Sequence, residues 1–277
     1  MEKLLEVRNL TKKYYVGKTE NKVVDNVSID VDKGEFVVIM GASGSGKTSL
    51  MHLIAGIDDF DAGSIKYMPA SGVTTKPPVD DTVDFGRMNG KAKAVFRQRN
   101  IGIVFQQQCL IPDLTVYENI MLPLMLKRRP LMLKRRPAGN GKQGKDIILR
   151  LCGQFGLTEH IRKYPSQLSG GQQQRAAILR SVVNEPPLLL CDEPTGSLNS
   201  AQTKRVMDLL SELNQKGQTI ILVTHDTKVA VRGKRIVYIE DGHAGGELTF
   251  TKAEGTGQDR MDKKEQELMD FLKERGW

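Results

Sequence analysis

The stretch that most limits the fold of this chain is a glycine-rich octapeptide at residues 41–48, Gly-Ala-Ser-Gly-Ser-Gly-Lys-Thr. It fits the pattern G-x-x-x-x-G-K-[ST], in which backbone N–H groups surround phosphate oxygens. The apolar run 35–40 before it is typical of a buried parallel strand, and 49–55 after it is predicted to be a helix with an apolar face. Strand, glycine loop and helix in this order predict an α/β protein that binds a nucleotide.

This loop offers both backbone and side-chain groups to a triphosphate. Its glycines let the backbone curve around the phosphates, and the following helix adds the positive end of its dipole. The ammonium of Lys47 is predicted to reach the β- and γ-phosphates, and the hydroxyl of Thr48 to bind Mg²⁺. The residues predicted to contact nucleotide here are Gly41, Ser43, Gly44, Ser45, Gly46, Lys47, Thr48 and Ser49.

Length and composition set the broad class. The 277 residues are enough for one large α/β domain, or for a core with a smaller lobe. No run approaches the roughly 18 consecutive apolar residues that indicate a transmembrane helix, and the N-terminus lacks a signal-peptide core. We therefore expect a soluble, cytosolic protein. Cys109, Cys152 and Cys191 lack metal-ligand spacing and are expected to be thiols of the core.

The formal net charge of +8 is concentrated in two basic triplets, 127–129 and 134–136. Both belong to the tandem repeat Leu-Met-Leu-Lys-Arg-Arg-Pro at 124–137, whose prolines predict a helix end followed by a basic connector. Two interpretations stay open, a solvated basic surface and a contact with lipid headgroups or a membrane partner. No base-reading module accompanies these charges, so no nucleic-acid partner is expected.

The N-terminal part predicts a β layer before the phosphate loop. Residues 4–14 and 23–31 alternate apolar and polar side chains, which is the period of a strand with one buried face. We expect these two strands to form an antiparallel layer. Residues 68–90 are rich in Pro, Gly, Thr and Asp and are predicted to be an extended surface loop.

The remaining chain predicts a helical lobe and then more of the parallel sheet. Residues 101–183 are predicted to be mainly helical after a short strand at 101–105. Strands and helices alternate from 188 to 242, as in a parallel sheet. Residues 261–277 place apolar side chains at helical spacing among charges and predict a short amphipathic helix.

Two further motifs extend this pattern. Residues 168–172 read Leu-Ser-Gly-Gly-Gln, and the apolar run 188–191 ends in Asp192 and Glu193. Together with the phosphate loop, and in this order, they make the chain resemble the ATP-binding cassette (ABC) ATPases over residues 4–248. In that family the pentapeptide of one subunit closes over the ATP held by the other subunit. The resemblance therefore implies ATP sites that are complete only in a dimer.

The carboxylates stand at the carboxyl edge of a predicted parallel strand, where such sheets bind ligands. Asp192 is placed to hold Mg²⁺, through water, and the resemblance makes Glu193 the base that polarises the attacking water. His225, after the apolar strand 219–224, corresponds to the family's switch histidine, which contacts the γ-phosphate. With Lys47, Glu193 and His225 form the predicted catalytic set.

Gln106 matches the family's Q-loop glutamine, which senses Mg²⁺, although Gln107 and Gln108 follow it directly. The predicted metal ligands are thus Thr48, Gln106 and Asp192. Tyr14 matches the aromatic residue that stacks on adenine, with Tyr15 as the competitor.

Four residues, Ser169, Gly170, Gly171 and Gln172, open the next predicted helix, and the resemblance implies that they form a clamp for the γ-phosphate of the partner's ATP. The chain departs from the family pattern in its D-loop. That loop usually ends in Asp, and here it ends in Asn199, which keeps hydrogen bonding without the charge.

The predicted fold class is α/β: a P-loop NTPase core with a mainly parallel sheet and flanking helices, an N-terminal antiparallel β layer, and a helical signature lobe. One ATPase domain is predicted over 1–250, with a core lobe at about 1–100 and 184–250 and a helical lobe at about 106–183. Residues 251–277 form a tail.

The stretches 103–107, 110–120 and 193–196 resemble the lipoprotein-release, macrolide-efflux and antimicrobial-peptide-resistance branch of the family. This implies an ATPase, with ATP and Mg²⁺ as cofactors, that pairs with a second ATPase subunit in a homodimer. Its other partner is a separate transmembrane permease, whose helices enter a groove near 106–125. The expected location is the cytoplasmic face of the membrane, held through that partner. A cell-division-type regulatory ATPase and a soluble non-transport ABC protein remain the alternatives.

Overall fold

The computed structural model describes residues 2–68, 82–127, 141–250 and 258–277. The chain divides into two compact units. The first unit contains Met1–Ala94 and Ser211–Trp277, and the second contains Val95–Leu210. Each unit is described separately below.

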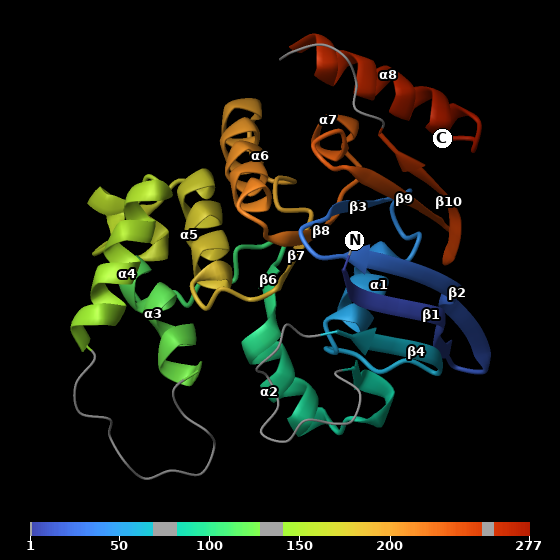
Figure 1. Cartoon of the computed structure of the whole chain (residues 1–277), viewed down its shortest axis with the longest axis horizontal. Coiled ribbons are helices and arrows are strands. Elements are labelled where there is room, and N and C mark those ends of the chain that lie inside the picture. The colour runs from blue at the N-terminus through green and yellow to red at the C-terminus, as the bar shows by residue number, and fades with distance from the viewer. Residues whose placement is uncertain (1, 69–81, 128–140, 251–257) are drawn as a thin grey trace. The chain divides into compact units, whose positions relative to one another are not determined.

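An antiparallel sheet forms the N-terminal part of the first unit (Figure 1). Its strands, in spatial order, are β2 (Thr19–Asp32), β1 (Lys3–Val16), β4 (Ala62–Tyr67) and β5 (Val83–Asp84). Val7 pairs with Ile29, and both side chains are buried, as the alternating pattern requires. The predicted antiparallel layer is therefore confirmed.

A second set of strands in this unit carries the phosphate loop. β3 (Phe36–Met40) runs parallel to both β8 (Thr219–Val223) and β9 (Arg235–Glu240), and β10 (His243–Thr249) pairs antiparallel with β9. Every residue of β3 is buried, which explains why its sequence is a continuous apolar run without alternation. The predicted parallel sheet is confirmed in these strands.

Helices complete the first unit. The helices within it are α1 (Lys47–Ile54), α7 (Thr227–Ala230) and α8 (Gln258–Lys273). In α8, Leu268 and Leu272 are fully buried, as the predicted amphipathic pattern requires. The ammonium of Lys264, on the same helix, donates hydrogen bonds to the carbonyl oxygens of Val231 and Gly233 at 2.9 and 2.8 Å. Since these carbonyls follow α7, Lys264 anchors α8 to the end of that helix.

The second unit is mainly helical among its described residues. Its two parallel strands are β6 (Ile101–Val104) and β7 (Leu188–Asp192). Its α-helices are α3 (Val116–Lys127), α4 (Gly141–Gln154) and α5 (Gly170–Val182), with the short 3₁₀ turns Thr158–His160 and Pro165–Gln167 before α5. Two helices, α2 (Gly90–Asn100) and α6 (Ser200–Gln215), continue from one unit into the other.

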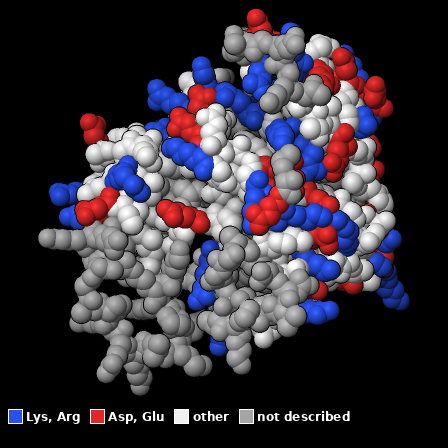
Figure 2. Space-filling view, in the orientation of Figure 1, with Lys and Arg blue, Asp and Glu red and all other residues white. Residues whose placement is uncertain are grey.

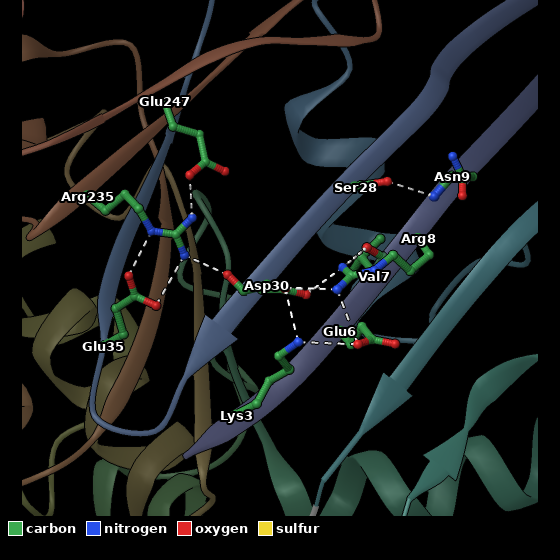
Figure 3. A network of polar contacts seen from close by, with 10 residues as sticks. All are labelled: Lys3, Glu6, Val7, Arg8, Asn9, Ser28, Asp30, Glu35, Arg235 and Glu247. Atoms are coloured by element: carbon green, nitrogen blue, oxygen red, sulfur yellow. Dashed lines mark hydrogen bonds and ion pairs between the residues drawn. The ribbon is translucent and has the colours of Figure 1, made fainter. Parts of the chain in front are cut away.

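A cluster of charged side chains connects the two sheets of the first unit (Figure 3). Arg235, on β9, donates to Glu35 and to Glu247, each at 2.8 Å, and to the backbone carbonyl of Asp30 at 2.5 Å. Burial by itself would lower the pKa of Arg235, but the hydrogen bonds to Glu35 and Glu247 have the larger effect, so the pKa is raised above its ordinary value. On the other side of the cluster, the hydrogen bond from Arg8 lowers the pKa of Asp30. One guanidinium thus links β2, β9 and β10.

The prediction of a surface loop at 68–90 is wrong in part. Residues 69–81 lie outside the described residues, but Val83–Asp84 and Phe85–Arg87 form a short strand and a 3₁₀ turn. The ring of Phe85 is fully buried and lies 4.9 Å from that of Tyr67, centroid to centroid. One aromatic anchor fixes a stretch whose composition is otherwise that of a loop.

Two further predictions concern the cysteines and the basic repeat. Cys152 and Cys191 are buried as predicted, whereas Cys109 is exposed and is not a core thiol. Residues 128–137 of the repeat lie outside the described residues, so both interpretations of it stay predictions. On the face seen in Figure 2, acidic side chains are interspersed with the basic ones among the described residues.

Candidate nucleotide-binding site

The predicted phosphate loop joins β3 to α1 in the first unit. Lys47 is the first residue of α1, and its side chain is buried. Its ammonium lies inside the loop, 2.9 Å from the carbonyl oxygen of Gly41 and 2.6 Å from that of Ala42. The loop is therefore closed around the cation that the sequence assigned to the phosphates.

Two glycines of this loop are required by close backbone contacts. At Gly46 φ is +99°, and a Cβ atom there would lie 2.1 Å from the carbonyl oxygen of Val23, on β2. At Gly41 a Cβ would lie 2.1 Å from the carbonyl oxygen of Ile239, on β9. A side chain at either position would push the loop away from the strands that shape it.

The loop presents an exposed rim and a buried base. Ser43, Gly44 and Thr48 are exposed, whereas Ser45 is buried and Ser49 half-buried. The exposed rim coincides with the N-terminus of α1, where N–H groups and the helix dipole favour an anion. This half of the site fits a phosphate chain.

Tyr14 is held by a specific anchor. Its hydroxyl donates to the carboxylate of Asp58 at 2.5 Å, and this hydrogen bond raises the pKa of Tyr14 to about 12. The ammonium of Lys12 contacts the same carboxylate at 3.0 Å and lies 4.9 Å from the centroid of the Tyr14 ring. Tyr15 is also exposed and bonds to Glu20. Both rings remain accessible to a base, so the choice of Tyr14 stays a prediction.

His225 follows β8 in the first unit and is exposed. The next residue, Asp226, is the N-cap of α7 and accepts hydrogen bonds from the N–H groups of Lys228 and Val229. This cap begins the helix two residues after the histidine, so His225 lies in the short connection between β8 and α7.

The second unit brings together two of the predicted site residues. β6 and β7 run parallel, so their carboxyl ends meet at one edge. There the side-chain amide of Gln106 donates to the carboxylate of Glu193, with 3.3 Å between Nε2 and Oε2. Asp192, the last residue of β7, is buried. Of the three adjacent glutamines, Gln106 is the one that contacts the carboxylate.

The backbone of Glu193 adopts a conformation that is unusual outside glycine, with φ at +41°. Such a conformation costs about 1–2 kcal/mol and persists where the surrounding structure enforces it. It turns the chain sharply after β7, so that consecutive carboxylates, Asp192 and Glu193, differ in exposure. The sequence signals this only through Pro194, which disfavours a helical continuation.

The signature pentapeptide forms the start of α5. Ser169 is the N-cap, its Oγ accepting from the N–H of Gln172, and the amide oxygen of Gln172 accepts from the N–H of Ser169 at 2.8 Å. Ser169 and Gly170 are exposed, and Gly171 is buried. The helix thus offers an open, capped N-terminus without an acidic residue in its first turn.

Asn199 has a clear local role in the second unit. Its side-chain oxygen accepts from the N–H of Gln202 at 2.9 Å and caps the start of α6. Asn and Asp are equally good in this position, so the missing charge does not weaken the cap.

Two residues that support the site were missed by the sequence reasoning. Asp58 anchors Tyr14 from 44 positions away. Arg180, on α5, donates to the carbonyl oxygens of Cys109 and Gln108 at 2.7 and 3.3 Å, and so ties the segment after Gln106 to the signature helix. No local pattern reveals either contact, because both depend on chain segments that meet only after folding.

A phosphate loop between β3 and α1, paired carboxylates at the end of β7 and a capped Ser-Gly-Gly helix define an ATPase of the cassette type. A family model described as ABC transporter matches residues 24–196, and the chain belongs to this family. It is an ABC ATPase. The predicted fold class and the ATPase activity are both confirmed.

The chain is 39% identical over 243 residues to the macrolide export ATP-binding/permease protein MacB of Syntrophobacter fumaroxidans. The match covers 86% of this chain but 31% of that protein, so this chain spans about a third of its length. The lipoprotein-releasing system ATP-binding protein LolD of Syntrophotalea carbinolica is 36% identical, with 88% of this chain and 97% of that protein covered. The predicted branch is confirmed by these relatives.

A solved structure is also similar, the dimeric ATP-binding cassette MJ0796 of Methanocaldococcus jannaschii bound to ADP and Pi. It has a TM-score of 0.76 and 35% sequence identity, and the match covers 90% of this chain and 100% of that one. Among the described residues of the present chain, no helix is both long and apolar enough to cross a membrane.

Proposed function

We propose that this chain forms a homodimer around two ATP molecules and drives a separate membrane permease, in export or in resistance to antimicrobial peptides. The observation that supports the proposal is the contact between Gln106 and Glu193, because the two side chains meet at one sheet edge. The roles of the individual site residues below belong to this proposal.

Binding of ATP begins at the phosphate loop. The ammonium of Lys47 is held by two neutral carbonyl oxygens, those of Gly41 and Ala42. Phosphate oxygens carry full charge and form stronger, charge-assisted hydrogen bonds with an ammonium. When ATP binds, the ammonium of Lys47 therefore leaves these carbonyl oxygens and binds the β- and γ-phosphates, while Tyr14 stacks on the adenine.

Hydrolysis uses the carboxylates at the end of β7. Glu193 accepts a proton from the attacking water, Gln106 holds that carboxylate, and His225 contacts the γ-phosphate. The donor set fits Mg²⁺, because Thr48, Gln106 and Asp192 offer hydroxyl, amide and carboxylate oxygens, the ligands that Mg²⁺ prefers. Bound there, Mg²⁺ would neutralise charge on the phosphate oxygens.

Dimerisation uses the open start of α5. Ser169 and Gly170 are exposed and carry helix N–H groups that can take the γ-phosphate of the partner's ATP. The dimeric form of the similar cassette MJ0796 supports this arrangement.

Coupling to a permease uses apolar side chains of the second unit. Ile111, Met125 and Leu126 are 37%, 55% and 47% exposed, so this unit offers apolar side chains that a partner helix can cover. They fall in and beside the predicted groove at 106–125. A short apolar helix of a permease fits such a surface and would hold this chain at the cytoplasmic face of the membrane.

The variant Glu193→Gln tests the proposal directly. It removes the base but keeps the shape and the amide-bonding capacity of the side chain, so ATP still binds. We expect turnover to fall by about 100-fold or more and an ATP-bound dimer to accumulate, measured by phosphate release and light scattering. Glu185→Gln, at an exposed position of the same unit, is the matched control and should behave as wild type.

Normal turnover by Glu193→Gln would remove Glu193 from the role of base. A variant that binds ATP but stays monomeric would instead contradict the dimer. Gentle extraction of tagged protein followed by mass spectrometry then identifies the permease: one with few transmembrane helices and a large extracellular domain supports the assigned branch.

A further inference from the structure

The side chain of Gln172 makes two contacts, both within the second unit. Its amide oxygen accepts from the N–H of Ser169 at 2.8 Å. Its amide nitrogen lies 2.9 Å from Nε2 of His160, in the 3₁₀ turn Thr158–His160 that precedes the signature segment. The amide that the sequence assigned to ATP is thus engaged by the chain's own residues.

The proton positions at these contacts follow from one fixed donor. The backbone N–H of Ser169 can only donate, so the amide oxygen of Gln172 must face it. The amide NH₂ group then points to His160, whose Nε2 must accept and carry no proton. Turning the amide over would set its NH₂ group against the N–H of Ser169, with two donors face to face.

The other nitrogen of His160 supports a specific role for this residue. In the neutral ring that accepts at Nε2, the proton sits on Nδ1. Within the described part of the chain, Nδ1 is buried and has no hydrogen-bond partner. Burying Nδ1 without a hydrogen-bond partner costs stability, so hydrogen bonding at Nδ1 does not explain why a histidine stands at this position. What it supplies is one acceptor, aimed at Gln172.

We propose that His160 is a positioning residue for the signature helix. As a neutral acceptor it holds the amide of Gln172 in the orientation that caps Ser169, and so it sets the N-terminus of α5 that receives the partner's ATP. Gln172 accordingly acts through the cap and does not itself contact the nucleotide. The inference rests on the proposed ATP-driven dimer.

Substitutions at position 160 can separate acceptor from donor. His160→Gln keeps an acceptor oxygen near the place of Nε2. His160→Arg keeps bulk but offers only donors, which oppose the amide NH₂ group. The double variant His160→Arg/Gln172→Glu restores a match, because a carboxylate accepts from both the introduced guanidinium and the N–H of Ser169, as in a capping box that ends in Glu.

The experiment uses the full chain in the Glu193→Gln background, where ATP-bound dimers accumulate. ATP-driven dimerisation is measured by light scattering over a protein titration, and binding of a fluorescent ATP analogue is measured on the monomer. We expect His160→Arg to weaken dimerisation about tenfold, since each dimer contains two such caps, while His160→Gln and the double variant stay within about threefold. Affinity of the monomer for the analogue should change less than about twofold in all variants.

Hydrogen exchange gives a second readout that does not require dimers. The amide of Ser169 should exchange faster in His160→Arg and return toward the parent rate in the double variant. Equal dimerisation by His160→Arg and the parent would overturn the inference, as would a loss in His160→Gln as large as that in His160→Arg. Failure of the parent itself to dimerise with ATP would instead contradict the proposed function.

Discussion

The side-chain amide of Gln106 donates to the carboxylate of Glu193 across 3.3 Å, although the two residues lie 87 positions apart in the chain. β6 and β7 run parallel and end at the same edge, which brings these side chains together. Gln107 and Gln108 do not make this hydrogen bond to Glu193, so substitutions at the three adjacent glutamines should have different effects.

Gln106→Ala removes the donor that holds Glu193. Because the base would then sample other orientations, we expect ATP turnover to fall about tenfold, less than on loss of the base itself. Gln107→Ala is the matched control, since Gln107 is exposed and follows directly in the chain; it should retain turnover within about twofold. Steady-state phosphate release measures both. A larger loss in Gln107→Ala would shift the sensor by one residue.

Tyr14→Ala should weaken ATP binding about tenfold, because base-to-aromatic stacking contributes roughly 1–3 kcal/mol. Tyr15→Ala serves as the comparison and should change the affinity less than about twofold. Tyr14→Phe keeps the ring but loses the hydroxyl that donates to Asp58, and it should fall between the two. Equilibrium titration with ATP decides among them; a greater loss in Tyr15→Ala would reverse the assignment.

Gly46→Ala and Gly44→Ala differ in what the new Cβ atom would meet. Both positions have positive φ, +99° and +83°, so both variants carry a backbone penalty of about 1–2 kcal/mol. At Gly46 the new Cβ would also meet the carbonyl oxygen of Val23 at 2.1 Å, whereas at Gly44 nothing lies within 4 Å. We expect the free energy of unfolding to fall by about 2 kcal/mol more in Gly46→Ala. Urea unfolding measures the difference, and equal losses would place the loop away from β2.

Lys264 should make the stability of the fold depend on alkaline pH. Burial lowers the pKa of Lys264 to about 8, against an ordinary value of 10.5. Between these values the unfolded chain binds more protons than the folded one, so the free energy of unfolding rises with pH. The cost of burying the charge is complete below about pH 8 and disappears toward 10.5, and it amounts to at most about 3 kcal/mol.

Lys264→Met is the control for this titration, because its side chain is neutral throughout. Other lysines and tyrosines titrate in the same window, so the relevant quantity is the difference in unfolding free energy between the two proteins. We expect that difference to grow in favour of Lys264 from pH 8 to 10.5. A difference that stays constant across this window would show that Lys264 keeps an ordinary pKa when α8 is docked.

Local motifs predicted most of the fold and named the site residues, since their physical causes are local. An apolar run such as Phe36–Met40 can only be buried on both faces, and a loop such as 41–48 needs its glycines wherever it occurs. The predictions that failed concern positions where contacts with distant parts of the chain decide the structure. Composition predicted a surface loop around Phe85, where one buried ring outweighs its polar neighbours. The spacing of the cysteines predicted a core thiol at Cys109, which is exposed.

The sequence by itself thus determined the class of the chain, the order of its elements, and the residues of its phosphate loop, carboxylate pair and signature pentapeptide. Only the tertiary structure decided which glutamine faces Glu193, what anchors Tyr14 and that His160 lies against the amide of Gln172. The physical reason is that a hydrogen bond depends on the distance and direction between two atoms. For residues on different elements, folding sets that geometry, and no spacing in the chain records it.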